Sequence, residues 1–155
     1  MSRRRWWWII GIVVVVGAPI AWYLGSPLFI SKTVVEEVPT VRVLSRGMFV
    51  DADAFHKGSG VALIAQAGTQ RLIRLEEFQV TNGPDLYVYL AAHPKPASRE
   101  DVHQGFLNLG RLKGNIGEQN YEIPAGEDLS RFHSVVIYCQ RFHVVFATAT
   151  LGGVQ

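Results

Sequence analysis

Cysteine is almost absent from this sequence: Cys139 is the only one among 155 residues. A single cysteine cannot form an intrachain disulfide, and it cannot supply the Cys-x-x-Cys-His sequence that attaches haem covalently. The chain also lacks the Gly-x-Ser-x-Gly, His-Glu-x-x-His and P-loop sequences. The sequence therefore gives no support to a hydrolase, a metalloprotease or a kinase, and it does not by itself establish whether the protein is an enzyme.

Acidic residues are absent from the first 30 positions. That segment holds three of the 15 lysines and arginines, so residues 31–155 carry 15 − 3 = 12 basic and 13 acidic residues, a net charge near −1. The net charge of +2 for the whole chain thus comes from a short N-terminal cluster. Because neither a basic stripe nor an RNA-binding aromatic motif is present, nucleic acid is not an expected partner.

A long uncharged stretch follows this cluster. Trp6 to Leu24 contains 19 residues without a charge, and all four tryptophans lie within the first 22 positions. An α-helix needs roughly 20 residues to cross a hydrocarbon core of about 30 Å, and aromatic rings favour the membrane interface. We therefore predict that residues 1–30 form a membrane anchor in contact with lipid, with a transmembrane helix from Trp6 to about Phe29.

Three arginines directly before the stretch indicate its orientation. Residues 3–5 should stay in the cytoplasm, which places the main domain in the periplasm or outside the cell. A cleaved signal peptide is the alternative, but its apolar region is shorter, roughly 7–15 residues, and ends at a small-x-small site. The sequence Ala-Pro-Ile-Ala at 18–21 does not supply that site. We therefore expect a single-pass membrane protein.

The remaining chain divides into a linker and one globular domain. Residues 31–46 are the predicted linker, since β-branched residues favour an extended backbone and Pro39 interrupts regular structure. In the predicted domain, residues 47–155, short runs of strand-forming residues alternate with turns such as Asn-Gly-Pro-Asp at 82–85. The expected strand segments are 60–67, 71–76, 78–81, 86–91, 106–112, 119–123 and 134–146, with a short helical turn over 98–102. This pattern predicts an all-β antiparallel β-sandwich, preceded by one N-terminal transmembrane helix.

Several ordered blocks of this domain resemble one family. The blocks are GMFVDADAFHKGSG at 47–60, LIRLEEF at 72–78, NGPDLYVYL at 82–90, LGRLKGN at 109–115, QNYEIP at 119–124 and SVVIYC at 134–139. Together they resemble the electron-transfer DM-thirteen domain over residues 47–151. The resemblance implies a β-rich extracytoplasmic domain with a redox role centred on a cysteine. It also implies a redox partner such as a cytochrome, because domains of this family occur beside cytochrome modules.

The cysteine of the last block is Cys139. The resemblance implies that this thiol takes part in electron transfer. The residues themselves leave an alternative open, because the run from Val135 to Tyr138 is typical of an interior strand, where a free cysteine commonly packs as a small apolar residue. In that case the protein would be a non-enzymatic binding or envelope-interaction module with a structural buried cysteine.

Two histidines, His56 and His143, are candidate cofactor ligands or proton partners for Cys139. His56 lies within the block at 47–60, and His143 follows the cysteine by four positions. On a straight strand the Cα atoms of residues 139 and 143 would be about 13 Å apart, too far for one metal ion, whereas a bend after Cys139 would bring them closer. No specific motif supports haem or copper, so the sequence assigns no cofactor and no metal site. Four tyrosines also fall in the expected strands, where core packing is their first expected role and an electron path a further option: Tyr87, Tyr89, Tyr121 and Tyr138.

Overall fold

The computed structural model describes residues 3–37 and 40–153, which fall into two units divided between Ile30 and Ser31. The first unit is a single helix, α1 (Arg3–Phe29), whose side chains from Trp6 to Trp22 are exposed. The predicted N-terminal helix is thus present. Within the described residues, no helix combines the length and the hydropathy that a membrane span requires.

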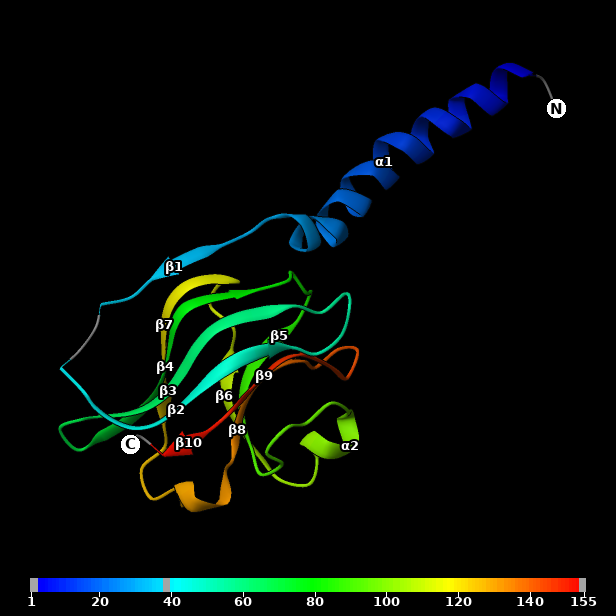
Figure 1. Ribbon diagram of the computed structural model, residues 1–155. Helices are drawn as coiled ribbons and strands as arrows, with labels where there is room; N and C mark the ends of the chain where they lie inside the picture. The colour runs from blue at the N-terminus through cyan, green and yellow to red at the C-terminus, as the bar shows by residue number, and fades with distance from the viewer. Residues whose placement is uncertain (1–2, 38–39, 154–155) are drawn as a thin grey trace. The chain divides into compact units, whose positions relative to one another are not determined.

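The second unit is a β domain, and its described strands form one ten-stranded sheet (Figure 1). The strand order is β1-β7-β4-β3-β2-β9-β8-β5-β6, and β10 pairs with β2 beside this path. The strands are β1 (Thr33–Val35), β2 (Arg42–Asp51), β3 (Gly58–Ala67), β4 (Gln70–Val80), β5 (Leu86–Ala91), β6 (Phe106–Arg111), β7 (Ile116–Ile123), β8 (Ser134–Cys139), β9 (Val144–Thr150) and β10 (Gly152–Gly153). A short helix, α2 (Arg99–Val102), and a 3-10 turn (Leu129–Arg131) complete the elements.

The all-β prediction is confirmed for this domain, but the strands form a curled mixed sheet instead of the expected antiparallel sandwich. The reason lies in β2, which pairs with β3 over residues 42–48 and with β9 over residues 49–51. One long strand therefore joins what would have been two separate sheets, and the sheet bends around it into a half-barrel (Figure 1). The sheet is mixed because β1 runs parallel to β7.

Both faces of the central strands are covered, which explains the unbroken apolar sequence of β8. Its six residues are all buried, and the last five alternate between two clusters of side chains. Val135, Ile137 and Cys139 belong to the larger cluster, inside the curl. Val136 and Tyr138 belong to the smaller cluster on the other face, where Val102 of α2 covers them.

The segment that we expected as a linker, residues 31–46, contains β1 and the first five residues of β2. β1 approaches β7 so closely that a Cβ atom on Gly117 would collide with the main-chain oxygen of Val34. Gly117 also has φ +110°, a conformation that other residues rarely adopt. Residues 32–36 are therefore bound to β7 by main-chain contacts.

Candidate functional site

Cys139 is the last residue of β8 and has a free, fully buried thiol. In the sheet it lies opposite Leu86 of β5 and Val144 of β9. Its cluster is otherwise apolar and includes Phe146, the extra residue of a bulge in the β8–β9 pair. With an exposed fraction of 0%, the sulfur cannot be reached by dissolved thiols or disulfides unless the domain opens.

His56 lies in the β2–β3 loop, where Asp53 holds it in place. Nδ1 of the imidazole is 2.6 Å from Oδ2 of Asp53, while Oδ1 accepts from the backbone N–H groups of Phe55 and His56 at 2.7 and 2.8 Å. These hydrogen bonds, led by the one from the imidazole, lower the pKa of Asp53 to about 2. The loop is thus a small polar unit that fixes the position of the ring.

The ring of His56 packs on Phe146, with centroids 4.3 Å apart. Phe146 belongs to the same core cluster as Cys139. The structure therefore brings His56, through its contact with Phe146, to the edge of the cluster that contains the thiol.

His143 lies in the turn between β8 and β9, has φ +57° and is exposed. The bend after Cys139 that could have brought the two side chains together is present, since residues 134–146 form two strands and a turn instead of one strand. However, Nδ1 of His143 is 3.4 Å from the hydroxyl oxygen of Tyr138, which belongs to the opposite cluster. The imidazole is therefore associated with Tyr138 and not with the thiol.

Potential metal ligands do not converge in the described part of the chain. Among residues 3–37 and 40–153, no group of three or more His, Cys, Asp or Glu side chains is placed to hold a metal ion. Cys139, His56 and His143 accordingly occupy three different surroundings: the apolar core, a polar loop and an exposed turn.

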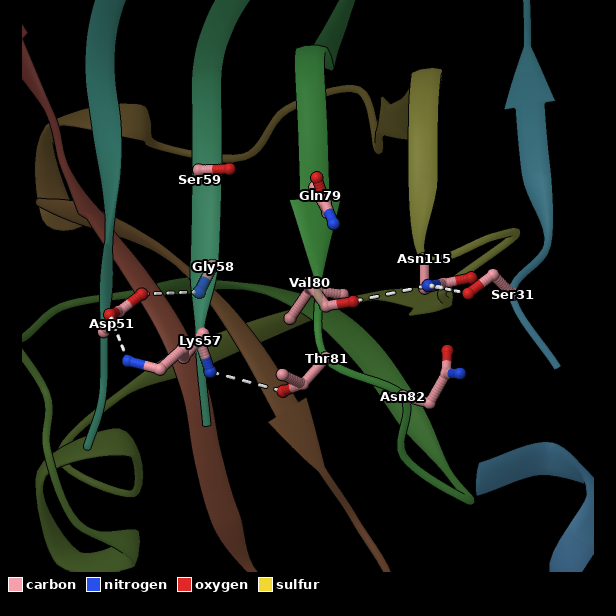
Figure 2. A pocket seen from close by; sticks show the side chains of 10 residues that line it. All are labelled: Ser31, Asp51, Lys57, Gly58, Ser59, Gln79, Val80, Thr81, Asn82 and Asn115. Carbon is pink, nitrogen blue, oxygen red and sulfur yellow. Dashed lines mark hydrogen bonds and ion pairs between the residues drawn. The ribbon is translucent and has the colours of Figure 1, made fainter. Parts of the chain in front are cut away.

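A polar pocket of about 420 Å³ lies where β3 begins, β4 ends and β7 begins (Figure 2). Asp51 accepts hydrogen bonds from the backbone of Gly58 at 2.9 Å and from Nζ of Lys57 at 3.1 Å, and these bonds lower its pKa. The backbone N–H of Lys57 donates to Oγ1 of Thr81 at 3.2 Å. The remaining lining is mostly amide and hydroxyl groups: Ser31, Ser59, Gln79, Asn82 and Asn115, with Val80.

This pocket can hold a small polar molecule by hydrogen bonding. Its lysine and aspartate neutralise each other, and its other polar groups are neutral, so the site favours no particular ionic charge. No local pattern in the sequence indicates this pocket, because its residues lie at or near the ends of β1, β2, β3, β4 and β7, which only the sheet brings together. Four of its residues, Asp51, Lys57, Gly58 and Ser59, fall within the sequence block at 47–60 that also contains His56.

A second polar cluster surrounds the buried guanidinium of Arg74, which is 1% exposed. Nε donates to Glu76 at 2.9 Å, Nη1 donates to Asn120 at 3.0 Å, and Nη2 donates to Glu118. Glu118 also accepts from the backbone N–H of Glu77, which has φ +48°. Every nitrogen of the guanidinium is paired, so this cluster supports the junction of β4 and β7 and leaves no guanidinium nitrogen free to bind a ligand.

Comparison with known proteins gives one match. The family model described as "Electron transfer DM13" matches residues 48–151, or 104 of the 155 residues. No curated protein and no solved structure matches the chain. The matched region contains Cys139, His56, His143 and the polar pocket except for Ser31, and it leaves out α1 and β1.

Proposed function

The chain belongs to the electron transfer DM13 family, and we propose that its β domain passes electrons to or from a redox partner, with Cys139 as the residue that carries them. The observation that supports this proposal most directly is the match of the family over residues 48–151, which include the only cysteine of the chain. The partner would be a redox protein such as a cytochrome.

The buried position of Cys139 restricts how such a transfer can work. A thiol with no exposed surface cannot exchange disulfides with a partner protein, because that reaction requires direct attack on sulfur. Electrons must then cross the protein between the thiol and the surface. His56 packs on Phe146 at the edge of the same cluster, so it is the candidate histidine that would act as a proton partner from that side.

The proposal can be tested on the purified full-length protein by voltammetry on an electrode, with an absorbance spectrum recorded first to detect any bound chromophore. We expect a reversible redox wave for the wild type and its loss in both Cys139→Ser and Cys139→Ala. Absence of a wave from the wild type would overturn electron transfer. A wave that persists in both variants would overturn only the role of Cys139.

A binding module is the second candidate function. It is favoured by the complete burial of Cys139 among apolar side chains, which is the usual position of a structural cysteine. The open polar pocket would then be its ligand site. A wild type without redox wave or chromophore would favour this candidate over the first.

Attachment to a membrane is a further part of the proposal, and its support comes from the sequence. Residues 3–5 are arginines, an uncharged stretch with all four tryptophans follows, and acidic residues begin only at Glu36. We propose a single-pass protein with the N-terminus in the cytoplasm and the β domain in the periplasm or outside the cell. Protease added to intact spheroplasts should digest the domain, and protection of the domain would overturn this orientation. A mature N-terminus near residue 26 would instead indicate a cleaved signal peptide.

A further inference from the structure

Two buried tyrosines pack against each other on the face of the sheet that α2 covers. Tyr89 of β5 and Tyr138 of β8 are 3% and 1% exposed, and their ring centroids are 5.3 Å apart. Burial raises the pKa of both phenols. Each phenol therefore keeps its proton near neutral pH, and it can give up an electron readily only where a nearby base takes that proton.

Aromatic rings continue from this pair to the surface in both directions. Phe106 stacks on Tyr89 with centroids 4.8 Å and planes 9° apart, and Phe106 is 41% exposed. The ring of His103 lies 5.3 Å from that of Phe106. On the other side, the ring of His143 lies 6.4 Å from that of Tyr138. The rings thus form one row whose two ends, Phe106 and His143, are exposed at the surface, with the two tyrosines buried between them.

The two phenol oxygens have chemically different partners. The hydroxyl of Tyr89 accepts a hydrogen bond from Nε2 of Gln140 at 2.6 Å, and an amide nitrogen cannot take up a proton. The hydroxyl of Tyr138 lies 3.4 Å from Nδ1 of His143, and a neutral imidazole can take one up. Of the pair, Tyr138 is therefore the phenol that has a base beside it.

Tyr138 is also the chain neighbour of Cys139, although the two side chains point to opposite faces of β8. The thiol lies in the inner cluster and has no exposed surface. The row of rings lies on the other face and reaches solvent. Tyr138, unlike the thiol of Cys139, is therefore connected to the surface by neighbouring rings.

We propose that Tyr138 is a one-electron redox residue of this domain, with His143 as its proton acceptor and with Tyr89 and Phe106 as the path to the surface. A high-potential one-electron oxidant on a partner protein, such as a high-valent metal centre, takes up the electron at Phe106. Tyr138 loses that electron, its O–H bond breaks, the proton moves to Nδ1 of His143, and a neutral tyrosyl radical remains. Return of one electron and of the proton restores the phenol. This inference rests on the proposed electron-transfer function, but it does not require Cys139 as the carrier.

The test uses the full-length protein with a ruthenium polypyridyl photo-oxidant attached at Gln104→Cys. Gln104 is exposed and lies two residues before Phe106, and the burial of Cys139 directs the label to the new thiol. After a laser flash in the presence of a sacrificial electron acceptor, the tyrosyl radical is measured by transient absorption and electron paramagnetic resonance. Tyr138→Phe removes the phenol, and Tyr87→Phe is the matched control, because Tyr87 packs against the same cluster.

We expect the radical in the labelled protein and in Tyr87→Phe, and its loss in Tyr138→Phe. His143→Gln, a change at an exposed position, should slow radical formation by roughly a hundredfold, the usual effect of removing a positioned base. An unchanged radical yield in Tyr138→Phe, or no radical in the labelled protein, would overturn the proposal. An unchanged rate in His143→Gln would overturn the role of the imidazole. Because the flash needs no natural partner, a radical without a voltammetric wave would count against the proposed function and not against Tyr138.

Discussion

The main-chain oxygen of Val34 in β1 occupies the space that a Cβ atom on Gly117 of β7 would need. Nearby, Gly114 leaves room in the same way for the main chain of Lys32. The side chain of Glu36 completes the attachment, since its carboxylate accepts from Nζ of Lys113 at 2.7 Å. β1 is therefore held against β7, and the absence of a Cβ atom at Gly114 and Gly117 makes the close approach of the two main chains possible.

Gly117→Ala should destabilise the domain more than Gly110→Ala does. Both glycines have φ +110°, but nothing lies within 4 Å of a Cβ atom at Gly110. Gly110→Ala therefore measures the cost of the backbone conformation alone, about 1 kcal/mol. The extra loss in Gly117→Ala measures the collision with β1. Urea unfolding gives both values, and cleavage by trypsin after Lys32 should be faster only in Gly117→Ala; equal losses of stability would contradict the steric explanation.

Arg74→Met should lower the free energy of unfolding by roughly 1–3 kcal/mol, because it leaves the partly exposed carboxylates of Glu76 and Glu118 without the buried guanidinium that pairs with them. Glu118, which is partly buried, loses its strongest partner in this variant. Arg71→Met is the matched control on the same strand, since Arg71 is only half-buried and donates to the main-chain oxygen of Glu127. Adding Glu118→Gln to Arg74→Met should restore part of the loss. Urea unfolding of the four proteins checks this, and equal effects of the two single arginine variants would show that the pairing contributes little.

Asp53→Asn should make stability less dependent on pH in the acid range. The pKa of Asp53 lies at about 2 in the folded protein, against an ordinary value of 3.8. A carboxylate with a lowered pKa contributes stability that is fully present above pH 3.8 and is lost as the pH falls through about 2. Thermal unfolding between these pH values should therefore show a smaller slope for Asp53→Asn than for the wild type. Glu122→Gln, at an exposed position of β7, should keep the wild-type slope.

The sequence predicted most of the β domain because its turns carry local signals. The strand at 86–91 has the predicted bounds, and the helical turn at 98–102 appears as α2, capped by Ser98. The curl of the sheet could not be predicted in this way, because it depends on which strands the two halves of β2 pair with. Strand β1 was missed for a similar reason: its three residues are held by Gly114 and Gly117, which lie some 80 positions away in the chain.

The candidate site shows the same division between local and long-range information. His143 follows Cys139 by four positions, and at this spacing the two side chains could meet only if the chain bends between them. The bend is present. However, successive side chains of β8 point to opposite faces of the sheet, so Tyr138 and not Cys139 lies on the face where the imidazole of His143 lies. The contact of His56 with Phe146 joins segments 90 positions apart, and no local pattern indicates it.

The proposed function depends on the reactivity of Cys139. In the native protein the thiol should react with a maleimide roughly a thousandfold more slowly than after denaturation, because reagents reach it only when this part of the core opens. The reference for an exposed thiol is Gln104→Cys in a Cys139→Ala background. Cys139→Ser places a hydroxyl among apolar side chains and should cost about 1–3 kcal/mol of stability, so Cys139→Ala is the better variant for functional comparison. If native Cys139 reacts as fast as the reference thiol, the sulfur is accessible, and a partner can exchange with it directly without electron transfer across the protein. If it is protected, any electron that it carries must cross the protein.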